Sequence, residues 1–146
     1  KLKDLYKKYD VVGCAGSKEV NLKPPALWHL MGGGFGSPNL HGAVAHLDNK
    51  GKKRMTPFGS YPNRAVIIDG VFMAIKRKVF QKIRFDESCP SKWHFYDLDY
   101  SMQCHKAGFK VGVGDILVTH NSPGLESFSE EFIKGQEWFL NKWKTK

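Results

Sequence analysis

The sequence contains few cysteines and no long apolar run. Only three of its 146 residues are cysteine, Cys14, Cys89 and Cys104, and their spacing is irregular. A sparse, odd set of this kind does not form a disulfide framework and favours a reducing compartment, so we predict a cytoplasmic location. No stretch of eighteen apolar residues occurs, and no basic start leads into an apolar segment. The sequence therefore predicts neither a transmembrane segment nor a signal peptide.

Acidic residues are also scarce relative to basic ones. The chain has 14 Asp and Glu against 23 Lys and Arg, a formal net charge of +9. Such a surplus favours an anionic partner, whether a nucleic acid, a phosphate-bearing small molecule or an acidic membrane surface. The basic clusters at 50–54, 76–78 and 142–146 lie far apart and carry no nucleic-acid recognition motif. Nucleic-acid binding would therefore rest on charge alone.

Hydrophobic residues make up 41% of the chain and aromatic residues 13%, which excludes a disordered protein. The periodicity predicts helices at 1–9, 77–83, 97–107 and 127–143, and strands at 10–16, 41–47, 65–68, 71–75, 110–113 and 116–120. The segment 50–54 reads as a charged turn. This alternation predicts a single α/β domain over residues 1–146. A long loop at about 17–38 interrupts it, and we expect that loop to be functional or mobile.

The segment from Trp93 to Asp99 has the most chemically suggestive composition. Asp97 and Asp99 stand two residues apart at a predicted helix start and follow three aromatic residues and a histidine. One interpretation is N-terminal capping, because aspartate accepts hydrogen bonds from free N–H groups there. The other is a general base beside aromatic surfaces that can stack on a sugar ring. Spacing alone favours capping, but it explains only one of the two aspartates well.

His120 ends an apolar strand and precedes a loop that contains glycine. Such a histidine can be a metal ligand, a hydrogen-bond donor or a partly buried structural residue. Together with Asp97 and Asp99 it could supply ligands to a divalent ion, although the three form no compact metal motif. The glycine-rich segment at 32–37 matches neither dinucleotide nor phosphate-loop patterns, so it indicates only a flexible loop near a ligand.

Several segments, taken in order, resemble family-2-like glycosyltransferases of the GT-A fold. The segment 66–77, which includes Asp69 and Gly70, is similar to an acceptor-side segment of that family, and 95–99 is similar to its acidic motif. The further similar segments are 11–17, 84–87, 107–113, 118–124 and 138–143. The match extends over essentially the whole chain, and the order and spacing of its segments make it fairly specific.

This resemblance implies a GT-A-like mixed sheet flanked by helices and a metal-dependent transfer of sugar from a nucleotide-sugar donor to an acceptor hydroxyl. It implies that Asp97 is the catalytic base and that His120 is a ligand of the donor-bound Mn²⁺ or Mg²⁺. It also implies that Asp69 and Gly70 line the acceptor cleft, with the glycine allowing the substrate to approach closely. Trp93 would be a sugar platform, and Asp99 would contact the acceptor or support the helix start.

The sequence departs from the family in one respect. The nucleotide-binding half and its metal-binding DxD motif would precede Lys1, so the chain resembles the acceptor-side half of a transferase. A sheet without those strands would expose an edge, from which we predict a homodimer. Two alternatives are a basic nucleic-acid-binding module and a non-catalytic carbohydrate-binding or scaffold domain. Binding that depends on salt and ignores sugar nucleotides would favour the former.

Overall fold

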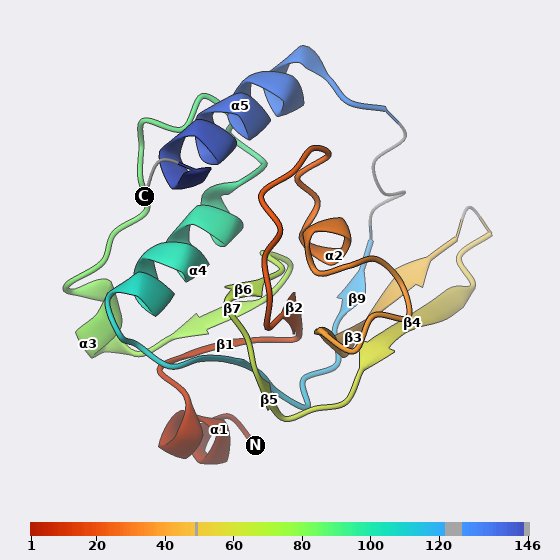
Figure 1. Cartoon of the computed structure of the whole chain (residues 1–146). Coiled ribbons are helices and arrows are strands. Elements are labelled where there is room, and N and C mark those ends of the chain that lie inside the picture. Colours follow the sequence, from red (N-terminus) through yellow and green to blue (C-terminus); the bar gives the residue numbers. More distant parts are fainter. Residues whose placement is uncertain (49, 122–126, 145–146) are drawn as a thin grey trace.

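The computed structural model describes residues 1–48, 50–121 and 127–144 (Figure 1). Its helices are α1 (Leu2–Lys8), α2 (Trp28–Met31), α3 (Arg77–Phe80), α4 (Tyr96–Lys106) and α5 (Glu130–Lys144). Its strands are β1 (Val11–Gly13), β2 (Ala15–Ser17), β3 (Leu40–Leu47), β4 (Lys53–Gly59), β5 (Asn63–Arg64), β6 (Ile67–Ile68), β7 (Met73–Ile75), β8 (Val111–Val113) and β9 (Thr119–His120).

The described strands form two sheets. One has the order β5-β8-β1-β7, and the other has the order β4-β3-β2-β6 with β9 paired to β3. The β1–β8 and β3–β9 pairs are parallel, and the other pairs are antiparallel. Only Cys14 separates β1 from β2, so one extended stretch of chain passes from the first sheet into the second. The mixed α/β architecture predicted from the alternation is therefore confirmed, with two sheets in place of one.

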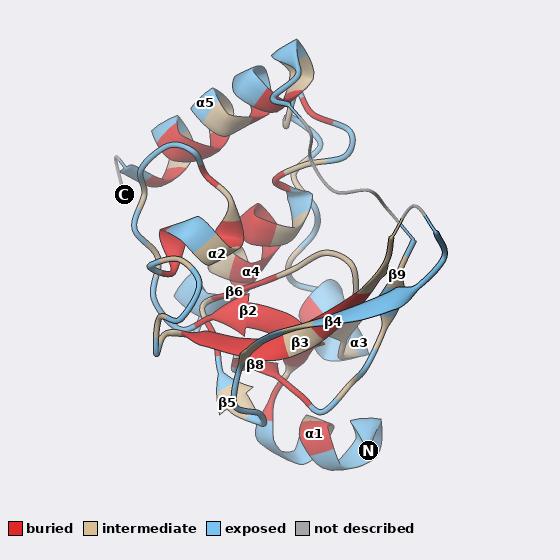
Figure 2. Cartoon of the chain, turned by 90° about the vertical axis from the view of Figure 1, so that its right-hand side faces the viewer, coloured by how far each residue is buried: buried red, intermediate tan, exposed pale blue. Residues whose placement is uncertain are grey.

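Helices cover both sides of the strands. In Figures 1 and 2, α4 lies against the sheets with α5 beyond it, and α1 lies on the opposite side. The buried residues are concentrated in the strands and on the inner faces of α4 and α5 (Figure 2). Phe132, Phe139 and Trp143 of α5 belong to the largest apolar cluster together with Leu98 of α4. Because α5 packs on Phe95, directly before α4, and contacts Asp99 of α4 through Lys142 and Trp143, it holds the helix that carries the acidic motif.

Two local predictions were wrong. The segment 17–38 holds the end of β2 and the helical turn α2, which the sequence analysis assigned to a loop. The turn is tied down by hydrogen bonds, since Asn21 N–H donates to the Met31 carbonyl and Ala26 N–H donates to Gln136 of α5. Strand β4 was also missed, because residues 50–54 read as a charged turn and Pro57 interrupts the apolar pattern. In the structure, β4 pairs with β3 along most of its length.

The predicted homodimer stays a prediction. Within the described chain β4 is an edge strand, and it carries Pro57, Lys53 and Arg54. Proline lacks the N–H that another strand would need, and basic side chains repel a second copy, so this edge resists strand pairing. No helix in the part of the chain described here is both long and apolar enough to cross a bilayer.

Candidate functional site

A pocket of about 620 Å³ lies among α2, β4, the residues after β6, the start of α4 and the end of β9. Its lining includes Asp69, Gly70, Trp93, Asp97 and His120. These residues are far apart in the sequence and come from separate elements, yet the fold gathers them around one cavity. Five of the six residues that the sequence analysis assigned to the site therefore line one pocket.

Asp69 and Gly70 directly follow β6, and hydrogen bonds to neighbouring elements hold both residues in place. Asp69 N–H donates to the Ala15 carbonyl at 2.9 Å, which continues the β2–β6 pairing past the end of the strand. The Asp69 carboxylate accepts from Trp28 Nε1 at 2.8 Å and from Val71 N–H at 3.0 Å. Gly70 allows a close approach, but here the approaching groups are protein: a Cβ at this position would lie 2.8 Å from Tyr96 Cζ and 2.9 Å from Asp97 Cβ. A side chain at position 70 would therefore push α4 away from the pocket.

Asp97 reaches the pocket because the first turn of α4 is fastened to β6. Ser101 Oγ donates to the Asp97 carbonyl at 2.6 Å and accepts from Ile68 N–H at 3.3 Å. Asp97 Oδ2 accepts from Gly70 N–H at 2.7 Å. The carboxylate is thereby placed beside the loop that carries Asp69.

Neither aspartate is the N-cap residue of α4. The N-cap residue is Phe95, which makes no side-chain cap hydrogen bond and has a left-handed backbone, with φ of 70°. Residues with a side chain rarely adopt this conformation, and it costs on the order of 1–3 kcal/mol. Packing holds it: the buried Phe95 ring lies between Phe132 and Phe139 and faces Gly135, where a Cβ would lie 2.7 Å from the ring. The Asp97 carboxylate is directed at Gly70, and it also interacts with the N–H groups of Asp97 and Leu98 in the first turn, which is the part of the capping interpretation that the structure retains.

The environment of Asp97 raises its pKa to about 7. Burial is the largest cause, because a carboxylate in a poorly solvated site is less stable than the neutral acid. The negative charge of Asp69 acts in the same direction. The two carboxyl groups therefore have different tasks. Asp69 accepts hydrogen bonds from Trp28 and from the Val71 backbone, whereas the pKa of Asp97 lies close to neutrality.

Aromatic side chains form the opposite wall of the pocket. Trp28 packs edge-on against Phe58 at 4.6 Å between ring centroids, and Phe58 stacks with Phe35 at 5.6 Å. His29 lies 5.1 Å from Phe35, and burial lowers its pKa. Sequence reasoning missed this wall because Trp28, His29 and Phe35 lie in the segment predicted as a loop and Phe58 lies in the strand that was not predicted. The aromatic and apolar residues within the segment 17–38 were the sequence feature from which a packed wall could have been predicted.

Trp93 and Tyr96 stand on the α4 side of the pocket. Trp93 is 76% exposed, so its indole presents most of its surface to solvent beside the cavity. Tyr96 Oη donates to the Gly70 carbonyl at 3.3 Å, and burial followed by the charges of Asp97 and Asp69 raises its pKa. The tyrosine therefore keeps its proton at neutral pH and remains a hydrogen-bond donor.

His120 lines the pocket, as the sequence analysis expected, and pairs in register with His46 of the neighbouring strand. Their ring centroids are 5.5 Å apart. The described residues contain no group of three or more His, Cys, Asp or Glu side chains arranged to hold a metal ion. Two imidazoles do not fit Mg²⁺, which prefers oxygen ligands. The segment 118–124, which carried part of the resemblance, lies only partly inside the described residues.

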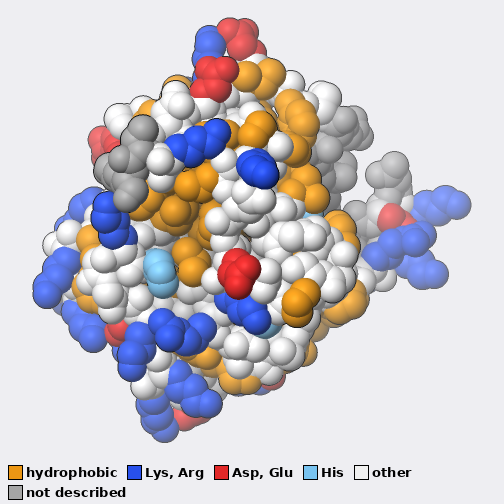
Figure 3. Space-filling model, in the orientation of Figure 1, with side chains coloured by type: hydrophobic (Ala, Val, Ile, Leu, Met, Phe, Trp, Pro, Cys, Tyr) orange, Lys and Arg blue, Asp and Glu red, His pale blue; other side chains and the backbone are white. Residues whose placement is uncertain are grey.

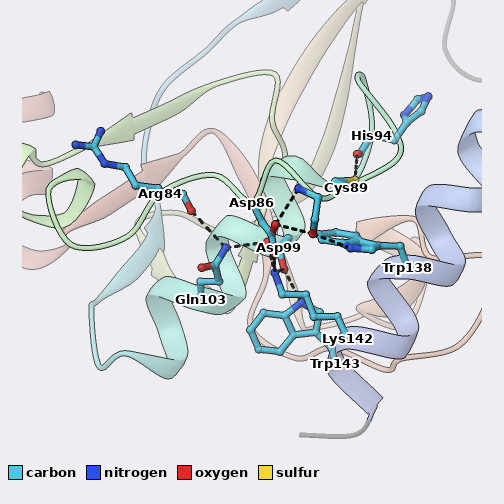
Figure 4. A network of polar contacts seen from close by, with 10 residues as sticks. Arg84, Asp86, Cys89, His94, Asp99, Gln103, Trp138, Lys142 and Trp143 are labelled. Atoms are coloured by element: carbon cyan, nitrogen blue, oxygen red, sulfur yellow. Dashed lines mark hydrogen bonds and ion pairs between the residues drawn. The ribbon is translucent and has the colours of Figure 1, made fainter.

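Asp99 points elsewhere. It is 1% exposed, and its carboxylate accepts from Trp143 Nε1 at 2.8 Å, from Gln103 Nε2 at 2.8 Å and from Lys142 Nζ. Lys142 also pairs with Asp86 at 2.6 Å, which holds the pKa of Asp86 at about 2 (Figure 4). Asp99 is thus the centre of a network joining α4 to α5. It does not line the pocket, and of the two roles expected for it, support of the helix is the one that this geometry favours.

The chain matches a known protein family. The model of the family described as "Glycosyltransferase like family" matches residues 4–138, which is most of the chain. No curated protein matches this chain. The matched range includes all the pocket residues named above, both aspartates of the acidic motif and most of α5.

Proposed function

The chain belongs to the glycosyltransferase-like family, and we propose that its pocket receives the acceptor hydroxyl of a sugar transfer for which Asp97 is the general base. A glycosyltransferase function in the general sense follows from the family, and the two-sheet α/β fold is consistent with a GT-A-like domain. The donor in this proposal is a nucleotide sugar, and the acceptor is a carbohydrate or another hydroxyl compound.

One observation carries the proposal. The Asp97 carboxylate lies in the pocket, accepts from Gly70 N–H at 2.7 Å, and has a pKa of about 7 because of burial and Asp69. A base is most effective when its pKa lies close to the working pH, because it is then largely ionised and still binds a proton well. An aspartate at its ordinary pKa of 3.8 would be a much weaker base.

The proposed step uses this proton affinity. The acceptor hydroxyl donates its proton to Asp97 as its oxygen forms a bond to the anomeric carbon of the donor. The bond from that carbon to the diphosphate oxygen breaks, and the nucleoside diphosphate leaves with the electron pair. Protonation of Asp97 removes its repulsion with Asp69, so the environment that raises the pKa also favours proton transfer.

The divalent metal stays a prediction. An ion on the diphosphate would neutralise charge on the leaving group, and His120 remains its candidate ligand. The described residues contain no group of three or more ligands that would complete a coordination sphere for it. We also keep Gly70 and Trp93 as acceptor-side residues, since both line the pocket.

The test is a transfer assay with Asp97→Asn in the full-length protein. Asparagine keeps the shape and can accept from Gly70 N–H, but it cannot take up a proton, so we expect transfer to fall by about 10²- to 10⁴-fold. Asp115→Asn is the matched control, because Asp115 is an exposed carboxylate outside the pocket. Near wild-type turnover by the Asp97→Asn protein would reject the base assignment. Sugar binding without transfer by the wild-type protein would instead support the non-catalytic alternative.

A further inference from the structure

The charges lining the pocket contrast with those of the whole chain. The chain carries a net charge of +9, yet the pocket lining found among the described residues contains Asp69 and Asp97 and neither Lys nor Arg. In Figure 3 the Lys and Arg side chains gather along the lower left of the molecule and at the end of the β3–β4 hairpin. Anionic ligands are ordinarily held by Arg and Lys, which form charge-assisted hydrogen bonds with them. His29, His46, His94 and His120 also line the pocket, but no lysine or arginine does, so an anion next to Asp97 would meet the charge of Asp69 without a permanent cation beside it.

The aromatic wall defined by Trp28, Phe35 and Phe58 lines the cavity, and Phe35 is its exposed member, since Trp28 is buried and Phe58 is half-buried. Phe35 is 66% exposed although it contacts both Phe58 and His29. Together with Trp93, it gives the pocket two large aromatic surfaces open to solvent. Exposed aromatic surface beside a cavity is typical of a binding site.

The loop that carries Phe35 is held in place. Gly34 N–H donates to the His29 carbonyl at 2.8 Å, and Ser37 Oγ donates to the Gly32 carbonyl at 2.7 Å. The backbone adopts positive φ at Gly33, Gly34 and Gly36, angles that residues with side chains rarely adopt. The glycines thus allow a tight loop that positions the Phe35 ring against Phe58. This positioning is the structural role of the glycine-rich segment.

Trp28 joins the aromatic wall to the carboxylates. Its ring packs on Phe58 while its indole N–H donates to Asp69 Oδ2. A ligand resting on the wall therefore lies beside the Asp69–Gly70 loop that positions Asp97.

We propose that the wall of Trp28, Phe35 and Phe58 is an acceptor subsite that selects an uncharged sugar ring and rejects phosphorylated or carboxylated ones. Sugar rings present faces of C–H groups that pack on aromatic rings and edges of hydroxyls that bind carboxylates, which matches the two walls. This inference rests on the proposed function, because it names the acceptor of the same site.

The test measures binding and transfer separately. Binding is followed by intrinsic tryptophan fluorescence with the methyl glycosides of glucose, galactose, mannose and N-acetylglucosamine, and with glucuronate and glucose 6-phosphate. We expect at least one neutral glycoside to bind roughly tenfold more tightly than either anion. Phe35→Ala should weaken that binding about three- to tenfold, since an aromatic contact contributes about 0.5–1.5 kcal/mol. Phe35→Tyr should restore it.

Phe80→Ala is the matched control, because Phe80 is a part-exposed phenylalanine on α3 outside the pocket. In the transfer assay, Phe35→Ala should raise the acceptor KM and leave the donor KM unchanged. Equal or tighter binding of the anions, or unchanged neutral-sugar binding by Phe35→Ala, would overturn the inference. Neutral-sugar binding with no transfer would reject the proposed function and leave this inference standing. Transfer to an acceptor that is not a sugar, with no sugar binding, would reject this inference and leave the proposed function standing.

Discussion

The raised pKa of Asp97 has a consequence for stability that can be measured without any substrate. In the unfolded chain the carboxyl ionises near its ordinary pKa of 3.8, whereas in the folded protein it ionises near 7. Between these values the folded state binds more protons than the unfolded state, so the free energy of unfolding falls as the pH rises. The stability that comes from keeping Asp97 protonated is fully present below the pKa of the unfolded chain. It is lost as the pH rises through the pKa of the folded protein.

The size of the effect follows from the two pKa values. At about pH 8 the ionisation of Asp97 lowers the free energy of unfolding by about 4 kcal/mol, and at about pH 5 by about 2 kcal/mol. Asp97→Asn cannot ionise but keeps an oxygen for Gly70 N–H. The difference in stability between Asp97→Asn and the wild type should therefore grow by about 2 to 3 kcal/mol in favour of the variant between these pH values.

Urea denaturation of both proteins at the two pH values measures this directly, and the comparison cancels the pH effects of the other groups. Asp115→Asn serves as the control for the loss of a carboxylate, since Asp115 is exposed and lies outside the pocket. A stability difference between Asp97→Asn and the wild type that stays constant from about pH 5 to about pH 8 would refute the argument. It would mean that Asp97 ionises alike in both states, and the case for a base near neutral pH would weaken with it.

Two further predictions concern the residues that position Asp97. Asp99→Ala should lower the free energy of unfolding by about 1–3 kcal/mol, because it removes the buried acceptor of Trp143 Nε1 and leaves Lys142 with Asp86 as its remaining ion-pair partner; a loss below about 0.5 kcal/mol in urea denaturation would contradict this. Gly70→Ala should lower stability by about 1–3 kcal/mol and transfer by more than tenfold, since its Cβ would lie within 3 Å of Tyr96 and Asp97. Adding Tyr96→Phe, which removes the hydroxyl that the new Cβ would meet, should recover part of both losses, and no recovery would count against this contact as the cause.

Local signals were sufficient for most of the elements. Apolar periodicity predicted α4, α5 and the strands around Ile67 and Val111, and Gly108 ends α4 with the expected left-handed backbone. These features depend on neighbours within one or two turns, so a short window of sequence contains their cause. Strand β4 was missed because it is an exposed edge: its burial alternates only weakly, and it exists because β3 pairs with it.

The sequence by itself determined the α/β class, the family resemblance and the candidates Asp69, Gly70, Asp97 and His120, because these depend on residue type and order. Only the tertiary structure separated Asp97 from Asp99. Side chains two residues apart on a helix point in directions that differ by about 160°. Asp97 therefore faces the pocket, and Asp99 faces α5. The tertiary structure also brought Trp28, Phe35 and Phe58 together on one wall of the pocket. Those rings meet through contacts between α2, its following loop and β4, which are distant in sequence, and no local pattern encodes a contact of that range.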